Sequence, residues 1–331
     1  MTHAAVDTDY LYLSARVRAM ERRLLSRAQA ERMLEAPTAE AAAGVLQECG
    51  YEELPRLNER SLEDVLAARR REIFCALYRV SPERRIIDVF RAPYDYQNVK
   101  ALLKAEAAGA DPAPLLTDAG RVCPAELREA MRSADLRGLP PPLQRAAAAG
   151  RDALRAGGPQ AADFALDRSC FAELGSLARE SGSAFLAGLI QLRIDSANLR
   201  AAVRALRRGM GVERLKDALL PGGGVAGGRL LQAAAGGGLE EACAASPLKE
   251  AAAAAGAALR GGRLARFEKL CDDAVLRYAA GGRYTAFGEA PVIGYLTAAE
   301  NELTAVRLLL RGRMAGLGAD AIQERLRAPY G

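Results

Sequence analysis

Histidine and tryptophan are nearly missing from this sequence: its only histidine is His3, and it has no tryptophan. A Ser-His-Asp triad, a Cys-His pair or a histidine-based metal site needs a histidine beside other functional groups. One histidine close to the start of the chain supplies none of these arrangements. We therefore predict no catalytic residues and no metal ligands.

Paired cysteines and long apolar runs are also missing. The six cysteines are scattered singly without a C-x-x-C pair, a spacing typical of reduced, buried thiols in a cytosolic protein. No stretch approaches the roughly 18–20 apolar residues that cross a bilayer. Residues 1–10 lack the basic-then-apolar pattern of a signal peptide. We therefore expect a soluble protein.

Nucleotide and nucleic-acid motifs are scarce. The net charge is +5, but no basic cluster is interleaved with aromatic residues, so no nucleic-acid partner is predicted. A single G-x-G-x-x-G match, Gly222–Gly227, follows a segment that reads as a helix, whereas a dinucleotide site needs a preceding strand. We interpret the match as coincidence and predict neither a cofactor nor a small-molecule substrate. A nucleotide-using enzyme stays an alternative that rests on this match alone.

The abundant residues favour helices. Alanine, leucine, arginine and glutamate are strong helix formers, and β-branched residues are sparse. We predict an all-α fold. The apolar spacing predicts a first long helix over residues 9–35, and Thr38 is placed to cap a helix that ends near Gly50. We interpret the Gly/Ala-rich stretch from Pro221 to Gly238 as a loop plus a weak helix, and it is the best linker candidate.

One ten-residue pattern occurs three times, in residues 95–104, 195–204 and 302–311. Each copy begins with an acid and has aliphatic residues at its fifth and ninth positions and bases at its sixth and tenth. On a helix, residues four apart lie one above the other, so the aliphatic pair faces a core and the bases form a neighbouring stripe. The polar members are Asp95, Asn98, Lys100 and Lys104, then Asp195, Asn198, Arg200 and Arg204, then Glu302, Arg307 and Arg311, with Ala305 replacing the asparagine in the third copy.

The spacing of the copies predicts three similar helical modules, residues 1–115, 116–218 and 219–331. The third starts with the Gly/Ala-rich stretch. Each copy precedes a glycine-containing helix end, at Gly109, at Gly209 and Gly211, and at Gly316 and Gly318. Two roles for the repeated polar residues stay open: the bases line a surface for a partner, or they pair with acids of this chain.

The first copy and several other segments resemble the C subunit of V/A-type rotary ATPases, the family of the eukaryotic d subunit. The resemblance covers roughly residues 9–109, 163–205 and 265–328, and Ala305 departs from the asparagine of the first two copies. The segments that carry it are Asp9–Glu21, Gly50–Leu54, Tyr94–Lys104, Leu166–Arg168 with Phe171, and Gly294–Glu302 with Val306 and Arg307.

The resemblance implies a funnel-shaped protein of three modules with pseudo-threefold symmetry. It implies a non-catalytic rotor subunit of the central stalk, on the cytoplasmic face of the plasma membrane. Its expected partners are the proteolipid (c/K type) ring of the membrane sector and the central shaft subunits (D and F type). It would transmit torque between ion flow and ATP synthesis or hydrolysis. The alternative is a helical scaffold unrelated to rotary ATPases.

Overall fold

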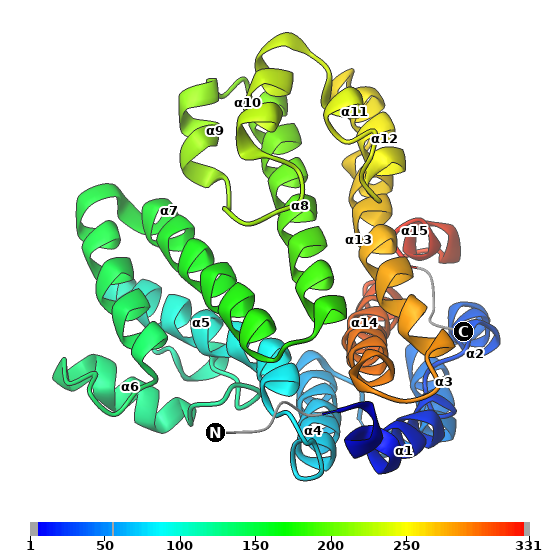
Figure 1. Ribbon diagram of the computed structural model, residues 1–331. Helices are drawn as coiled ribbons and strands as arrows, with labels where there is room; N and C mark the ends of the chain where they lie inside the picture. Colours follow the sequence, from blue (N-terminus) through cyan, green and yellow to red (C-terminus); the bar gives the residue numbers. More distant parts are fainter. Residues whose placement is uncertain (1–5, 55, 328–331) are drawn as a thin grey trace. The chain divides into compact units, whose positions relative to one another are not determined.

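The computed structural model describes residues 6–54 and 56–327, and over these residues the chain is helical and contains no β-strand (Figure 1). The prediction of an all-α fold is confirmed. None of the helices in this part of the chain combines the length and apolar character needed to span a bilayer. His3 lies outside the described residues.

The chain divides into two compact units. Unit 1 contains Met1–Glu83 and Gly236–Gly331, and unit 2 contains Arg84–Ala235. Unit 1 therefore combines the two ends of the sequence, while unit 2 is one continuous segment. The three repeat modules describe a different level of organisation, and the division at residues 115 and 218 stays a prediction.

Unit 2 is built on three long helices. In Figure 1, α7 runs beside both α5 and α8, and α5 and α7 share the largest contact. A break divides α7 at Gly158, whose φ of 75° leaves the helical region ahead of Pro159. The helices are α5 (Arg85–Ala108), η3 (Ala113–Leu115), α6 (Pro124–Ser133), α7 (Pro141–Glu180), α8 (Ala184–Arg207), α9 (Val212–Ala218) and α10 (Gly227–Gly236).

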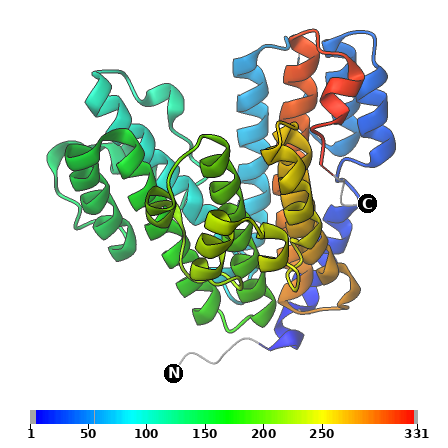
Figure 2. The same cartoon turned by 90° about the horizontal axis from the view of Figure 1, so that it is seen from above.

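Unit 1 is organised around α14 (Glu289–Met314). This helix is buried along most of its length, as expected for a central helix that is apolar on nearly all sides. Figure 2 shows it between α4 and the α2–α3 pair, which it contacts. The other elements are η1 (Asp7–Tyr10), α1 (Leu11–Glu21), α2 (Arg27–Glu35), α3 (Ala39–Gly44), η2 (Val45–Cys49), α4 (Glu59–Tyr78), α11 (Leu239–Ala242), α12 (Lys249–Leu259), α13 (Leu264–Ala280), η4 (Gly281–Tyr284) and α15 (Ala319–Gln323).

The predicted helix over residues 9–35 is wrong in its continuity, because the chain breaks between α1 and α2. Ser26 begins α2 with a capping box: its backbone N–H donates to Gln29 Oε1 at 2.9 Å and its Oγ accepts the Gln29 N–H at 3.3 Å. Leu25, immediately before the cap, donates its N–H to Glu302 instead of to α1. The expectations for Thr38 and Gly50 are confirmed, since Thr38 Oγ1 accepts the Ala41 N–H and Gly50 has a φ of 80°.

The cysteines match their expected state in part. All six are free thiols, and four of them are buried. Cys75 and Cys123 are exposed, so the expectation of burial is wrong for these two.

The three repeat helices, α5, α8 and α14, end in the same way. Gly109, Gly209 and Gly316 each adopt a left-handed backbone, with φ of 63°, 64° and 70°, and each follows the acid of its copy by fourteen residues, since 109 − 95, 209 − 195 and 316 − 302 are all 14. The predicted aliphatic ridge is confirmed, because its members in all three copies are at most 1% exposed. The next N–H after each glycine donates to the carbonyl five residues back at 2.9 Å, from Ala110 to Ala105, Met210 to Ala205 and Leu317 to Gly312.

Candidate functional site

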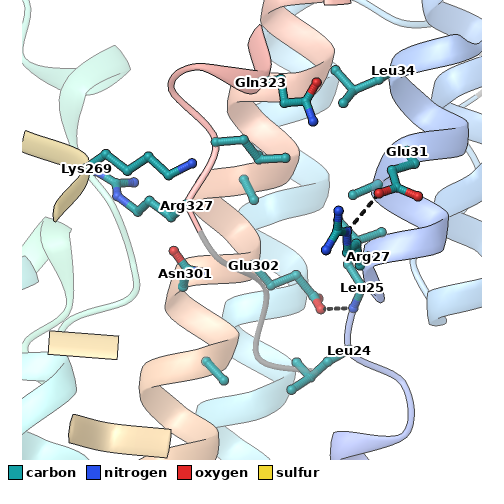
Figure 3. A pocket seen from close by; sticks show the side chains of 14 residues that line it. Leu24, Leu25, Arg27, Glu31, Leu34, Lys269, Asn301, Glu302, Gln323 and Arg327 are labelled. Carbon is teal, nitrogen blue, oxygen red and sulfur yellow. Dashed lines mark hydrogen bonds and ion pairs between the residues drawn. The ribbon is translucent and has the colours of Figure 1, made fainter. Parts of the chain in front are cut away.

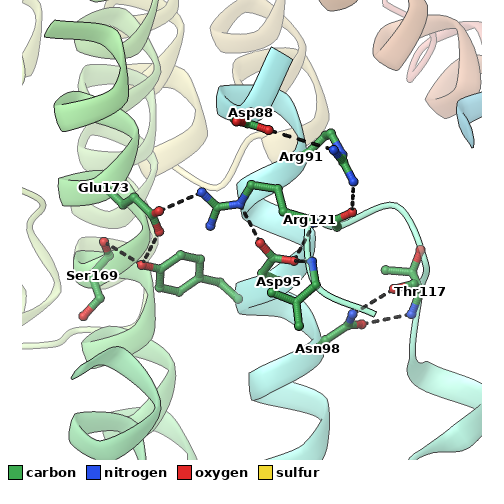
Figure 4. Close-up of polar contacts among 11 residues, drawn as sticks. Asp88, Arg91, Asp95, Asn98, Thr117, Arg121, Ser169 and Glu173 are labelled. Atoms are coloured by element: carbon green, nitrogen blue, oxygen red, sulfur yellow. Dashed lines mark hydrogen bonds and ion pairs between the residues drawn. The ribbon is translucent and has the colours of Figure 1, made fainter. Parts of the chain in front are cut away.

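The acid of the first copy anchors the loop that precedes α6 (Figure 4). Asp95 is fully buried, and its Oδ1 accepts the N–H groups of Arg121 at 2.8 Å and Val122 at 3.1 Å. One turn further on, Asn98 accepts the Thr117 N–H at 2.9 Å and donates to the Thr117 carbonyl at 2.8 Å. These four bonds hold residues 117–122 against α5, and we call this arrangement the first joint.

Arg121 adds a buried charge network to the first joint. Its Nε donates to Asp95 Oδ2 at 2.8 Å, and its Nη1 donates to Glu173 Oε1 at 2.7 Å. Tyr96 donates its hydroxyl to the other oxygen of Glu173 at 2.8 Å. Burial raises the pKa of Asp95 above its usual range, and the neighbouring Arg121 opposes this rise. One guanidinium thus serves two buried carboxylates, from α5 and α7.

The second copy forms the same arrangement before α10. Asp195 accepts the N–H groups of Gly224 at 3.0 Å and Val225 at 2.9 Å. Asn198 accepts the Leu220 N–H at 2.7 Å and donates to the Leu220 carbonyl at 2.8 Å. This second joint holds residues 220–225, and it has no arginine in the place of Arg121. The same four backbone bonds therefore recur in the same order along both loops.

A glycine packs directly on each aspartate. A Cβ atom on Gly120 would lie 2.2 Å from Asp95 Oδ1, and one on Gly223 would lie 2.2 Å from Asp195 Oδ1. The Gly222–Gly227 match to a dinucleotide motif therefore has a structural explanation. Its loop lies between two helices, α9 and α10, and two of its N–H groups are bound by Asp195.

The third copy anchors a segment from the other end of the chain. Glu302 is 5% exposed; its Oε2 accepts the Leu25 N–H and its Oε1 accepts the Tyr51 hydroxyl at 2.7 Å. Leu25 lies two residues before the start of α2, as Val122 and Val225 do before α6 and α10. We call this the third joint. It has no asparagine clamp, because Ala305 replaces Asn98 and Asn198.

Four of the repeated bases lie close to acids of the same unit. Lys100 Nζ is 2.6 Å from Asp167 Oδ1, and Lys104 Nζ is 2.8 Å from Asp163 Oδ2. In unit 1, Arg307 and Arg311 both approach Glu63 Oε1, at 2.7 and 3.3 Å. Arg200 and Arg204 also have interaction partners. A partner-facing role for these side chains stays a prediction.

Sequence reasoning missed the residues that complete the joints. Arg121, Glu173 and Tyr51 stand outside the repeated pattern, and the two key glycines stand in loops of different composition. One signal could have found the loops, namely the residues that mark the start of the next helix. Val122 lies two residues before α6, which begins at Pro124, and Val225 lies two residues before α10, which begins in the Gly-rich segment. No group of three or more potential metal ligands occurs among the described residues.

Glu302 gives the third joint a predicted pH dependence. Burial raises its pKa, while Tyr51, Leu25 and the charge of Arg69 oppose the rise. The folded protein therefore binds this proton more tightly than the unfolded chain, so this site's contribution to stability falls as pH rises above the ordinary glutamate range toward the raised pKa. We expect Glu302→Gln to remove this contribution.

The measurement is urea unfolding of both proteins at about pH 5 and about pH 8. The free energy of unfolding of Glu302→Gln minus that of the wild type should be larger at the higher pH than at the lower pH. Glu250→Gln is the control that should show little difference between these two pH values, because a hydrogen bond from Arg277 lowers the pKa of Glu250 and its stability contribution changes only below this window. A stability difference between Glu302→Gln and wild type that is the same at both pH values would contradict the prediction.

The fold and its joints define an all-helical protein in which a buried carboxylate on each of three repeated helices holds the start of a further helix. The sequence profile of the family described as ATP synthase (C/AC39) subunit matches residues 13–325. The chain belongs to this family.

Two archaeal relatives, each named as the C subunit of an A-type ATP synthase, are similar to parts of the chain. The protein of Thermococcus kodakarensis is 26% identical over 234 residues, which is 65% of this chain and 62% of the relative. The protein of Methanocaldococcus jannaschii is 26% identical over 122 residues, 33% of this chain and 30% of the relative. The matches therefore span less than two thirds of either relative.

Proposed function

We propose that this chain is a non-catalytic rotor subunit in the central stalk of a V/A-type ATPase. It links the shaft subunits (D and F type) to the proteolipid ring at the cytoplasmic face of the membrane, and it transmits torque between them. The observation that carries the proposal is the family match over residues 13–325. The names of the two archaeal relatives agree with it.

The chemistry of the joints supports a mechanical role. Hydrogen bonds from backbone N–H groups to a carboxylate are stronger than neutral ones and fix the geometry between the groups they join. Asp95, Asp195 and Glu302 each use such bonds inside a buried environment. Helices joined in this way resist displacement, which a torque-transmitting part requires.

The same geometry argues for a non-catalytic role. A general acid or base must be within hydrogen-bond reach of a substrate proton. The carboxylates of Asp95 and Asp195 are buried and are already bonded to groups of this chain, so they are not presented to a substrate. Glu302 lines a pocket, but both of its oxygens already accept hydrogen bonds from this chain. The Gly-rich loop that could cradle a phosphate is bound to Asp195.

Affinity purification of the tagged chain from native membranes tests the proposal. Mass spectrometry of the eluate is expected to recover proteolipid and shaft subunits in constant ratio to the chain. Recovery of other partners without these subunits would overturn the proposal and favour the unrelated helical scaffold.

We further propose that the repeated bases act mainly as braces between helices of this chain. Four ion pairs in the structure support this role. We expect Lys104→Asp to lower the recovery of partners, since it places two acids side by side at Asp163. The swap Lys104→Asp with Asp163→Lys restores the pair in reverse and should restore recovery.

The swap separates the two roles that the sequence left open. If Lys104 faces a partner, the reversed pair restores the fold but not the charge that the partner meets, and recovery stays low. Circular dichroism and urea unfolding of both variants report separately on the fold. Persistently low recovery from a swap variant of wild-type stability would overturn the brace role.

A further inference from the structure

The third repeat keeps the register of the second beyond the repeated helix itself. Gly318 and Gly211, two residues after the left-handed glycines, have nearly the same backbone angles, with φ of −64° in both and ψ of 154° and 155°. A short helix begins at the next residue in each copy. This helix buries Ile322 in α15 and Leu215 in α9, and each of them lies six residues after the left-handed glycine of its copy, Gly316 or Gly209. Counting on from the two glycines, Arg327 corresponds to Leu220, because 327 − 316 and 220 − 209 are both 11.

This register shows what the third joint lacks. Leu220 is the residue whose N–H and carbonyl are clamped by Asn198. In the third copy the facing residue is Ala305, which has no amide to form such a clamp. Arg327 is held instead through its side chain, by an ion pair with Asp272 of α13.

A pocket of about 310 Å³ lies at the third joint (Figure 3). Its lining includes Leu24 and Leu25 from the N-terminal segment, Glu302 and Ala305 from α14, and Arg327. In the first two joints, by contrast, Asn98 and Asn198 each tie the loop to the repeat helix one turn after the acid. The second joint also borders a cavity, of about 440 Å³, whose lining includes Leu220, Gly223 and Val225. The third joint differs in that no asparagine ties the backbone of Arg327 to the repeat helix.

The third joint also differs in chain connection. Five residues lead from Thr117 to Val122, and five from Leu220 to Val225, so each of those loops is continuous across its joint. At the third joint, Arg327 and Leu25 come from opposite ends of the sequence. Arg327 is tied by the side chain of Asp272 and Leu25 by that of Glu302, and Leu25 also packs in the hydrophobic core of unit 1.

We propose that the third joint is a seam in unit 1, a latch that opens before the other two joints. Three polar interactions hold it: the hydrogen bonds from Leu25 and Tyr51 to Glu302, and the Arg327–Asp272 ion pair. The side chains of that pair are 32% and 21% exposed, so salt weakens their attraction. The inference rests on the joints alone and does not depend on the proposed function.

Hydrogen exchange of single backbone amides, read by mass spectrometry with electron-transfer fragmentation, tests the seam. The Leu25 amide is expected to exchange at least about tenfold faster than the amides of Val122 and Val225, because the missing clamp removes two hydrogen bonds. Added salt should speed exchange at Leu25 alone. Equal protection of the three amides would overturn the proposal.

Variants address each half of the latch. Asp272→Asn removes the ion pair and should speed exchange at Leu25 about threefold. Glu250→Gln removes an exposed ion pair between Glu250 of α12 and Arg277, which lies in α13 as Asp272 does. This variant should leave exchange at Leu25 unchanged. The Val225 amide is the internal reference, because global unfolding would speed its exchange as well. Unchanged exchange at Leu25 in Asp272→Asn would count against the latch.

Adding the missing clamp is the converse test. Ala305→Asn restores the amide opposite Arg327, where the pocket leaves room, and should slow exchange at Leu25 about tenfold. Ala305→Leu fills the same space without an amide and should slow it less. Equal slowing by both variants would overturn the proposal, because packing rather than the absent clamp would then set the opening.

Discussion

Replacing Arg121 with methionine is expected to lower the free energy of unfolding by about 3–5 kcal/mol, the usual cost of removing one partner from a buried ion pair. Methionine keeps much of the side-chain volume but leaves Asp95 and Glu173 without their shared cation. Asp95 is fully buried and Glu173 is 7% exposed, so water cannot replace the guanidinium. Urea unfolding followed by circular dichroism at neutral pH measures the change.

Two further variants identify the cause of that loss. Arg132→Met removes a pair with Glu129 whose side chains are 73% and 60% exposed, and it should leave the unfolding midpoint unchanged. In the Arg121→Met background, Glu173→Gln removes one of the two unpaired charges and keeps an acceptor for the Tyr96 hydroxyl. It should therefore recover part of the stability. A further loss in this double variant would show that packing, not charge, explains the effect.

The sequence was sufficient for the parts of the fold that local patterns determine. The aliphatic pairs of the three copies are buried because they recur every four residues on a helix. The three repeat helices end at Gly109, Gly209 and Gly316 because glycine adopts the left-handed conformation of a helix end without strain. Both features depend on residues within one helix, and a single sequence contains that information.

The roles of the acids depend on distant residues, and local patterns do not contain them. The N–H groups that Asp95 and Asp195 bind lie 26 to 30 residues downstream, and the one that Glu302 binds lies 277 residues upstream. The predicted helix over residues 9–35 failed for a different reason, because a local signal was present. Ser26 and Gln29 form a recognisable capping box, which the apolar spacing alone does not reveal.

The Gly-rich segment was difficult for a different reason. Several glycines in a row match a phosphate-binding motif by composition alone, and their meaning depends on what they approach. Gly223 lies against Asp195, as Gly120 does against Asp95, yet the two loops share little sequence. Only the position of each glycine relative to an aspartate on another helix relates them.

This contact makes Gly223 and Gly120 the most sensitive glycines to replace with alanine. A Cβ at 2.2 Å from the carboxylate oxygen forces the aspartate away from the two N–H groups that donate hydrogen bonds to it. Losing or distorting these charged hydrogen bonds in a buried site is expected to cost about 3 kcal/mol in either variant. Thermal and urea unfolding of Gly223→Ala and Gly120→Ala measure the loss, and the two should be similar.

Gly228→Ala is the matched control, five residues further along. No atom lies within 4 Å of a Cβ there, and Gly228 lies in α10, where alanine favours the helix, so this variant should be neutral or slightly more stable. A double-mutant cycle then tests the cause. Once Asp195→Ala has removed the carboxylate, adding Gly223→Ala should cost little, giving a coupling of about 2 kcal/mol. Additive losses would mean that Gly223 is needed for the backbone of the loop and not for its contact with Asp195.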